Sequence, residues 1–546
     1  MKKIDKIFDG YFNEWLLLYP FEASLLGFDV LDEIEEIPVN ISEEFKEKEI
    51  NFYKKYKSLI KNIDLDEMDE KEKIHLKALE ITCDISLKEL KFPDNLLPIN
   101  HFYSFHLIFP AISSGLNQSF KNKKEILNFY KKINYFKNWA EEAVLNLKKG
   151  ISLKIILPSI IVEKILKQLE YFIKTKREKN PIFKPIYLIE KEFNGKDKEK
   201  EIDKIKKEIE NKVLTSYEKI YKFLKDDYLK NCSENIGLYN LPDGYEWYKA
   251  KIKRFTTLEI EPEEIYNYAL KELRELKEKD KEIKRENIKI NDYIEFLKKF
   301  KKELKEKLKE YFYEFPKKDF KILPMEKYKE KTSSLGEYFM GGVDKKSKPI
   351  FYLNLNLAKK KNLNELLAIF FHEAIPGHHF QISLQRENEK LPSFLRYHIF
   401  EAFVEGWALY SENLAFKIGL VEDENYKKVI IKNKIWRTLR LIADTGIHTG
   451  KFKKDGVVKI LMDEGKFKKD EAEIETLRYA VFPGQALTYK IGEQVFFDLK
   501  EKGEKELKDK FNLKEFHKVL LQDGSLPLNL LKEKINKWIK NKKILC

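Results

Sequence analysis

Three of the nine histidines in this 546-residue chain lie within eight residues, in the segment HEAIPGHH over 372–379. Histidine is the side chain that binds metals most often, so this local density predicts a metal site. In the zinc motif H-E-x-x-H, two histidines one helical turn apart hold the metal, and the intervening glutamate acts as a general base. His372 and Glu373 match the start of that motif, but the second histidine does not follow at the usual spacing.

That departure has a backbone explanation. Pro376 lacks an N–H group, and in a regular helix its ring would clash with the carbonyl of His372. Gly377 then allows conformations that other residues avoid. We therefore expect the helix to break here and the chain to turn His378 back towards His372. His379 is the competing second ligand, because seven residues return it to the face of His372, although about 10 Å further along a regular helix.

The residues before the histidines predict the helix that carries them. Asn362 and Glu365 have the spacing of a capping box, in which each side chain accepts a hydrogen bond from the other residue's backbone. Apolar residues then recur with a helical period. We expect His372 and Glu373 to extend a helix packed against the core. The apolar positions are Leu363, Leu366, Leu367, Phe370 and Phe371.

A third ligand is expected from a later helix. Catalytic zinc takes three protein ligands and leaves one position for water. The segment 393–417 predicts a single helix capped by Ser393 and carries glutamates among apolar residues. Glu405, within VEGWALY, is flanked by apolar side chains, and a buried carboxylate needs a cation or a metal. We predict Glu405 as the third ligand, with a buried ion pair as the alternative, and expect Glu401 to hold a ligand histidine in place.

Composition indicates what surrounds this site. The 21 glycines and 17 prolines are about 7% of the chain, against about 12% in average proteins, which favours long helices over an all-β fold. We expect one large helical catalytic unit over 1–546, with possible sub-lobes at 1–240 and 241–546. The exception is a β-patch at about 318–356, where aromatic and β-branched segments predict two or three strands. The strand at 349–356 either pairs with an extended peptide as an edge strand or only covers the core.

Charge and cysteine content restrict the partners. The net charge is +14, but basic and acidic residues interleave, which indicates solvated helix faces and no nucleic-acid partner. The three cysteines are far apart and form no CxxC pair, which favours a reducing compartment. Acidic residues interrupt the N-terminal apolar stretch, and apolar runs fall short of the roughly 20 residues that a membrane span needs. We therefore expect a cytoplasmic protein with no membrane partner.

Several segments resemble one family. HEAIPGHHFQ followed by EGWALY resembles the bacterial domain-of-unknown-function 885 family, whose members look like zinc metallopeptidases. The segments at 244–265, 437–452 and 478–493 are similar to further motifs of that family, so the resemblance spans nearly the whole chain. It implies a mainly α-helical, zincin-like metallopeptidase fold with the sheet beside the active-site helix. It also implies a hydrolytic zinc, and it leaves the substrate undefined.

Polar side chains in the last two of these motifs are candidates for binding substrate. A peptidase needs a hydrogen-bond donor for the developing oxyanion besides the metal, and Arg or Lys suits a substrate carboxylate. A purely structural role is the alternative for each of them. The candidates are Tyr489 and His448 for the oxyanion, Arg440, Arg478 and Lys490 for a carboxylate, and Gln485 for substrate backbone.

These inferences predict a zinc-dependent hydrolase that cleaves peptide bonds, in short peptides. One Zn²⁺ is expected to be bound by His372, His378 and Glu405, with water in the fourth position and manganese or cobalt as other possible ions. Glu373 is the expected general base and the later proton donor to the leaving amine. The alternatives are a zinc hydrolase of a non-peptide amide, and a non-catalytic metal-binding structural or interaction protein whose coordination shell is closed by His379. The sequence defines no oligomeric state.

Overall fold

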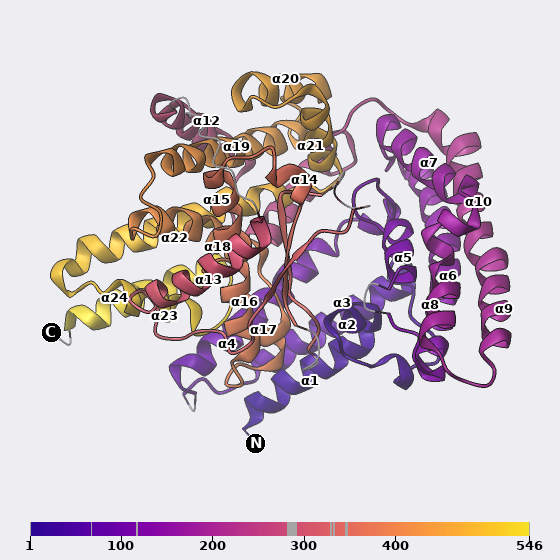
Figure 1. The fold of residues 1–546 in the computed structure, drawn as a ribbon, viewed down its shortest axis with the longest axis horizontal. Helices are drawn as coiled ribbons and strands as arrows, with labels where there is room; N and C mark the ends of the chain where they lie inside the picture. The colour runs from indigo at the N-terminus through magenta and orange to yellow at the C-terminus, as the bar shows by residue number, and fades with distance from the viewer. Residues whose placement is uncertain are drawn as a thin grey trace.

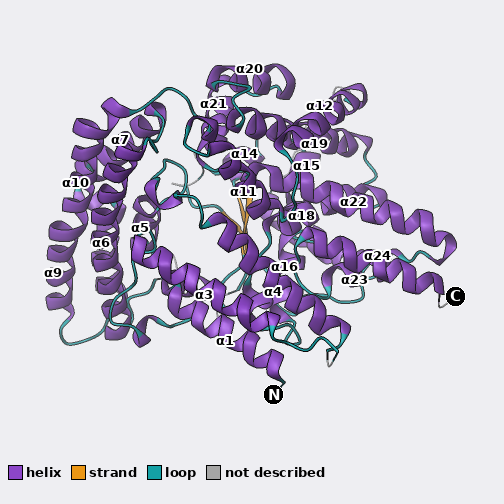
Figure 2. Cartoon of the chain, turned by 180° about the vertical axis from the view of Figure 1, so that it is seen from behind, coloured by secondary structure: helices purple, strands orange, loops and turns teal. Residues whose placement is uncertain are grey.

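The computed structural model describes residues 2–66, 68–115, 118–280, 292–327, 330, 333–343 and 348–544. Over these ranges the chain is mainly α-helical and contains one three-stranded sheet (Figure 1, Figure 2). The predicted fold class is confirmed at that level. Within the same ranges, no helix combines the length and the apolar character needed to cross a bilayer.

Helices α5 to α10 form a bundle at one side of the molecule (Figure 1). The bundle has its own aromatic core, in which the ring centroids of Phe105 and Tyr135 lie 4.8 Å apart and those of Phe109 and Phe136 lie 4.7 Å apart. A π-helical segment, Ile209–Leu214, joins its last two α-helices. The helices are α5 (Phe105–Ser113), α6 (Lys123–Leu153), α7 (Ser159–Lys174), α8 (Lys184–Glu192), α9 (Lys198–Glu208) and α10 (Thr215–Phe223).

A larger core joins the first helices to the second half of the chain. The ring of Phe394 lies 5.2 Å from that of Phe8 and 5.8 Å from that of Tyr11. The helices within residues 3–89 thus share apolar surface with the later helices, whereas residues 105–223 pack mainly around a core of their own. The helices before the bundle are α1 (Lys3–Leu18), α2 (Pro20–Leu26), α3 (Glu43–Lys61) and α4 (Glu70–Glu89).

The remaining helices build the part of the molecule that carries the histidine motif. The segment 393–417, expected to be one helix, is two helices separated at His398–Phe400, and the N-cap of the first is Pro392 rather than Ser393. The helices that follow the bundle are α11 (Gly244–Thr256), α12 (Pro262–Lys279), α13 (Tyr293–Leu308), α14 (Leu355–Ala358), α15 (Leu363–Glu373), α16 (His378–Glu387), α17 (Ser393–Tyr397), α18 (Glu401–Lys417), α19 (Glu424–His448), α20 (Lys454–Gly465), α21 (Lys469–Val481), α22 (Thr488–Leu507), α23 (Leu513–Leu521) and α24 (Leu528–Ile544).

The predicted β-patch is a sheet of three strands, β1 (Lys321–Pro324), β2 (Gly336–Phe339) and β3 (Ile350–Leu353), in the order β1-β3-β2. β1 is parallel to β3, and β2 is antiparallel to it. β3 is therefore the central strand, so the idea that it could pair with a peptide as an edge strand is wrong. β2 is an edge strand, and it contacts α15 because Gly336 has no side chain: a Cβ there would lie 3.2 Å from Cγ1 of Ile369.

Candidate metal centre

The histidine motif spans a break between two helices. The predicted capping box starts α15: the backbone N–H of Glu365 donates to Asn362 Oδ1 (2.8 Å), and that of Asn362 donates to Glu365 Oε2 (3.0 Å). α15 ends at Glu373 and α16 begins at His378, as the positions of proline and glycine predicted.

Close backbone packing turns the chain at this break. A Cβ on Gly377 would lie 1.9 Å from the carbonyl oxygen of His372 and 2.3 Å from that of Phe371, so only glycine fits there. The indole N–H of Trp407 on α18 donates to the carbonyl of Pro376 at 2.8 Å, which satisfies a backbone group in the break. The two contacts bring the start of α16 back towards the end of α15.

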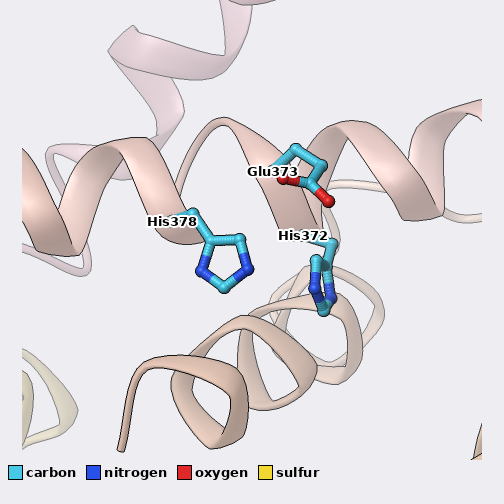
Figure 3. Close-up of side chains that lie close together, drawn as sticks. All are labelled: His372, Glu373 and His378. Carbon is cyan, nitrogen blue, oxygen red and sulfur yellow. The ribbon is translucent and has the colours of Figure 1, made fainter. Parts of the chain in front are cut away.

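The three predicted ligands converge. The imidazole rings of His372 and His378 lie side by side and nearly perpendicular, with centroids 4.7 Å apart (Figure 3). Glu405 Oε2, from α18, lies 3.5 Å from Nε2 of each histidine. Ligand atoms about 2.0–2.1 Å from a tetrahedral zinc are separated by about 3.4 Å, so the carboxylate oxygen lies at the distance from each imidazole nitrogen that one such ion requires.

The charges around this point favour a cation. Glu405 Oε2 and His378 Nδ1 are buried and have no hydrogen-bond partner within the described part of the chain. Burial lowers the pKa of His372, but Glu405 and Glu412 outweigh it and raise that pKa to about 10. The carboxylates therefore hold a positive charge here even without a metal, which fits a divalent ion bound by two imidazoles and a carboxylate.

Glu412, and not Glu401, positions the first ligand. Glu412 Oε1 lies 2.7 Å from His372 Nδ1, and Asn433 Nδ2 donates to Glu412 Oε2 at 2.9 Å. A proton on Nδ1 leaves Nε2 of His372 free to bind a metal. Glu401 forms no hydrogen bond or ion pair with a histidine among the described residues; burial raises the pKa of its carboxyl group, and the positive charge of Arg254 opposes that rise.

Glu373 lies beside the predicted ligands His372 and His378. Its ligand atom is within 4.8 Å of those of His372 and His378. Its Oε2 accepts a hydrogen bond of 3.0 Å from the backbone N–H of Tyr338 on β2, and burial raises its pKa. A carboxylate held beside the ion, with a raised pKa, is suited to accept a proton from water.

His379 points away from this centre. Its Nδ1 lies 3.3 Å from the hydroxyl of Tyr338 and 3.2 Å from that of Ser383, and its ring packs on Phe320 with centroids 4.5 Å apart. The structure therefore brings His378, rather than His379, to His372.

Glycines place a second helix close to Glu405. A Cβ on Gly406 would lie 2.4 Å from the carbonyl carbon of Gly492, and a Cβ on Gly492 would lie 2.0 Å from the carbonyl oxygen of Ala402. The backbones of α18 and α22 are thus in contact beside Glu405. Tyr489, a predicted oxyanion donor, lies on α22 one turn before this crossing, half-buried.

Two of the predicted substrate residues have structural partners. His448 is fully buried, and its ring nitrogens bond to the backbone N–H of Leu238 (3.1 Å) and the carbonyl of Tyr479 (3.0 Å). Lys490 is 1% exposed, and its Nζ donates to Glu272 (2.7 Å) and Glu493. These contacts occupy both imidazole nitrogens of His448 and the ammonium group of Lys490. We therefore assign structural roles to both residues in place of the predicted roles in binding substrate.

The other four candidates form one cluster with Glu475. Arg440 Nη2 lies 3.4 Å and Arg478 Nη1 lies 3.7 Å from the Glu475 carboxylate. Arg478 Nη2 also donates to Gln485 Oε1 at 2.8 Å, and the Arg440 guanidinium lies 4.4 Å from the ring centroid of Tyr489. Arg440, Arg478, Gln485 and Tyr489 are therefore neighbours, as the predicted substrate site requires.

The sequence analysis did not assign roles to Glu412, Asn433 or Tyr338. Glu412 follows Glu405 by seven residues, which returns it to the same helix face, so its spacing was a usable signal. Asn433 and Tyr338 act from other elements, and no local pattern marks them.

A cavity of about 620 Å³ lies beside the start of α18. His398, Phe400 and Arg254 are among its lining residues, whereas the three ligand side chains are not.

Comparison with known proteins supports the fold. A solved structure of "the putative lipoprotein from Colwellia psychrerythraea" is similar with a TM-score of 0.89 at 20% identity, covering 99% of this chain and 100% of the other. "A putative lipoprotein of unknown function from Shewanella oneidensis" is similar with a TM-score of 0.69 at 18% identity, covering 98% and 99%. At such identities the likeness concerns the fold alone.

No curated protein matches the sequence. The model of one family does match, over residues 20–535, and that family is described as a bacterial protein of unknown function (DUF885). Because the match covers nearly the whole sequence, the chain belongs to the DUF885 family.

Proposed function

We propose that this protein is a zinc-dependent hydrolase of peptide bonds with a zincin-like site. The observation that carries the proposal is the convergence of His372 Nε2, His378 Nε2 and Glu405 Oε2, with 3.5 Å from the carboxylate oxygen to each nitrogen. Two imidazoles and a carboxylate are a donor set that catalytic zinc uses. When bound, zinc would polarise the scissile carbonyl and lower the pKa of water.

The protein's own groups supply the proton transfers. Glu373, held by the backbone N–H of Tyr338, accepts a proton from the attacking water and then delivers it to the leaving nitrogen. Tyr489 remains the candidate donor to the oxyanion, because the ring nitrogens of His448 are bonded to backbone groups. Glu412 keeps the His372 ring in the orientation that directs Nε2 to the centre.

A non-catalytic metal site with a closed shell is less well supported. It needs a fourth protein ligand, and the sequence offered His379 for that role. The contacts of His379 with Tyr338, Ser383 and Phe320 direct its ring away from the other three donors. An open fourth position is what a hydrolytic centre requires.

The test combines metal analysis with turnover. Glu373→Gln should retain one zinc per chain and lose at least about 100-fold in kcat, because only the proton acceptor is removed. His372→Ala should lose the zinc. Glu424→Gln, at a side chain 74% exposed at the start of α19, is the control and should match the wild type in both measurements.

Substrates are a peptide library and a panel of non-peptide amides, with zinc measured by mass spectrometry. Wild-type turnover by Glu373→Gln would overturn the general-base assignment. Zinc-loaded protein that hydrolyses only the non-peptide amides would overturn the peptide assignment and leave the hydrolytic centre in place.

A further inference from the structure

One face of α19 carries a line of polar residues that lead away from the metal centre. Asn433, Arg437, Arg440, Asp444 and His448 follow one another at spacings of three or four, so they share a helix face. All are buried except Asn433, which is partly exposed. Buried polar groups in folded proteins are normally paired, so each member should have a partner.

Four of these five residues have a hydrogen-bond or ion-pair partner. Each partner comes from another helix, from the loop before α11 or from the loop before α22. Asn433 donates to Glu412 (2.9 Å), Arg440 lies 3.4 Å from Glu475, Asp444 accepts from the hydroxyl of Tyr248 (2.6 Å) and from the backbone N–H of Gly484 (3.0 Å), and His448 bonds to Leu238 and Tyr479.

Arg437 is the exception. It is 7% exposed, and its Nε and Nη1 are buried without a hydrogen-bond partner in the ranges that the structure describes. Its guanidinium stacks on the ring of Trp436, 4.1 Å from the centroid, which fixes the group without neutralising it. An unpaired buried charge is unfavourable, so its retention points to an anion that binds there.

The neighbouring carboxylate, Glu475, leaves positive charge at this site that an anion would neutralise. Glu475 is already shared by Arg440 and Arg478, and it also accepts from the hydroxyl of Tyr479 at 2.6 Å. Nε and Nη1 of Arg440 are buried and, among the described residues, likewise without a partner. Arg440 and Arg478 therefore share one carboxylate, whereas Arg437 forms no ion pair with any residue that the structure describes, so the surplus positive charge lies at Arg437 and Arg440.

The position of Arg437 relates this surplus to the metal centre. Arg437 lies one helical turn, about 6 Å, after Asn433 on α19. Asn433 contacts Glu412, and Glu412 contacts the ligand His372. On its other side, Arg437 lies 6.0 Å from the ring centroid of Tyr489. The unpartnered guanidinium thus lies between the ligand-holding pair and the candidate oxyanion donor.

We propose that Arg437, assisted by Arg440, binds the C-terminal carboxylate of a peptide substrate, so that the enzyme removes residues from the carboxyl end. This inference rests on the proposed peptide hydrolysis. A guanidinium group matches a carboxylate in charge and in planar geometry, and a monoanion would neutralise the surplus. Arg437 is then a specificity-determining residue in addition to those expected from the sequence.

The first experiment measures binding without catalysis. Metal-free protein is titrated calorimetrically with Ala-Ala-Phe as the free acid, with the same peptide as its C-terminal amide, and with Ala-Ala-Glu amide. The free acid should bind at least about 30-fold more tightly than either amide, since losing one partner of a buried charge pair weakens binding by that factor or more.

Arg437→Gln should bind the free acid and its amide equally. Arg177→Gln, which removes an exposed arginine paired with Glu210, is the control and should keep the preference. Equal binding of acid and amide by the wild type would overturn the proposal. Tight binding of Ala-Ala-Glu amide would show that the site takes a side-chain carboxylate and would overturn the C-terminal assignment.

Thermal unfolding separates a binding role from a structural one. Arg437→Gln should not lower the Tm, because it removes an unpaired buried charge, whereas Arg440→Gln should lower it by leaving Glu475 with one guanidinium fewer. A Tm loss in Arg437→Gln equal to that in Arg440→Gln would contradict the proposal. If the protein binds the free acid more tightly than the amide but hydrolyses no peptide, the carboxylate site is supported and the proposed function is refuted.

Discussion

The contact between Glu412 and His372 gives a sharp prediction about metal affinity. The side chains of these residues are 3% and 5% exposed, and Glu412 Oε1 lies 2.7 Å from Nδ1. A buried hydrogen bond to a charged group contributes about 1.5–3 kcal/mol. At 1.4 kcal/mol per tenfold, Glu412→Ala should therefore weaken zinc binding by about 10- to 100-fold.

Glu412→Gln should have the smaller effect, near tenfold, since the amide oxygen can still accept from Nδ1 but carries no charge. The matched control is Glu401→Gln, which changes the glutamate one turn before Glu405 on α18. Burial raises the pKa of Glu401, and no ligand histidine is among its charge partners, so zinc affinity in this variant should stay within about twofold of wild type.

Zinc dissociation constants are measured at pH 7 by competition with a chromophoric chelator, with circular dichroism confirming that each variant keeps its helix content. Wild-type affinity in both Glu412 variants would refute the positioning role. A loss in Glu401→Gln as large as in Glu412→Ala would show that the choice between the two glutamates is wrong.

Two further predictions concern the backbone break and the pH dependence of stability. Gly377→Ala would place a Cβ 1.9 Å from the carbonyl oxygen of His372, so we expect lost zinc binding and a lower Tm. Both effects should be absent from the control Gly456→Ala, because a Cβ there would lie 3.6 Å from the nearest atom of Phe452, an ordinary van der Waals distance. Full zinc occupancy in Gly377→Ala would contradict the account of the break. Burial raises the pKa of Glu49 from 4.5 to about 7, although a hydrogen bond from Tyr19 opposes this. The folded state therefore keeps a proton that the unfolded state releases, and stability should fall as the pH rises from about 4.5 to 7. Glu49→Gln should reduce that loss, measured as urea midpoints at pH 5 and pH 8, and an unchanged pH slope would disprove it.

The convergence of His372, His378 and Glu405 could be predicted because its signals are local. Proline and glycine within HEAIPGHH dictate a break whatever surrounds them, and the capping box fixes where α15 starts. Glu405 was identified from apolar neighbours on its own helix. The sheet was predicted for the same reason, since short aromatic and β-branched segments are marked by composition.

The rest depended on how elements cross in space. Glu401 and Glu412 lie on the same face of α18 on either side of Glu405, so only the direction in which α15 crosses α18 decides which one reaches His372. His448 and Lys490 have side chains that suit catalysis, but their partners come from distant segments that no local pattern indicates. The central place of β3 likewise follows from strand order, which the sequence does not encode locally.

The contact of Gly406 with Gly492 has a consequence for how the protein could change in evolution. Where side chains separate two helices, a substitution in the layer between them alters their spacing gradually. Here main-chain atoms meet directly, so covalent geometry and van der Waals radii set the distance between the backbone that carries Glu405 and the backbone that carries Tyr489. The relative position of these two segments can thus stay constant while the surrounding apolar residues drift, and changes in the shape of the neighbouring surface must come from elements other than this pair of helices.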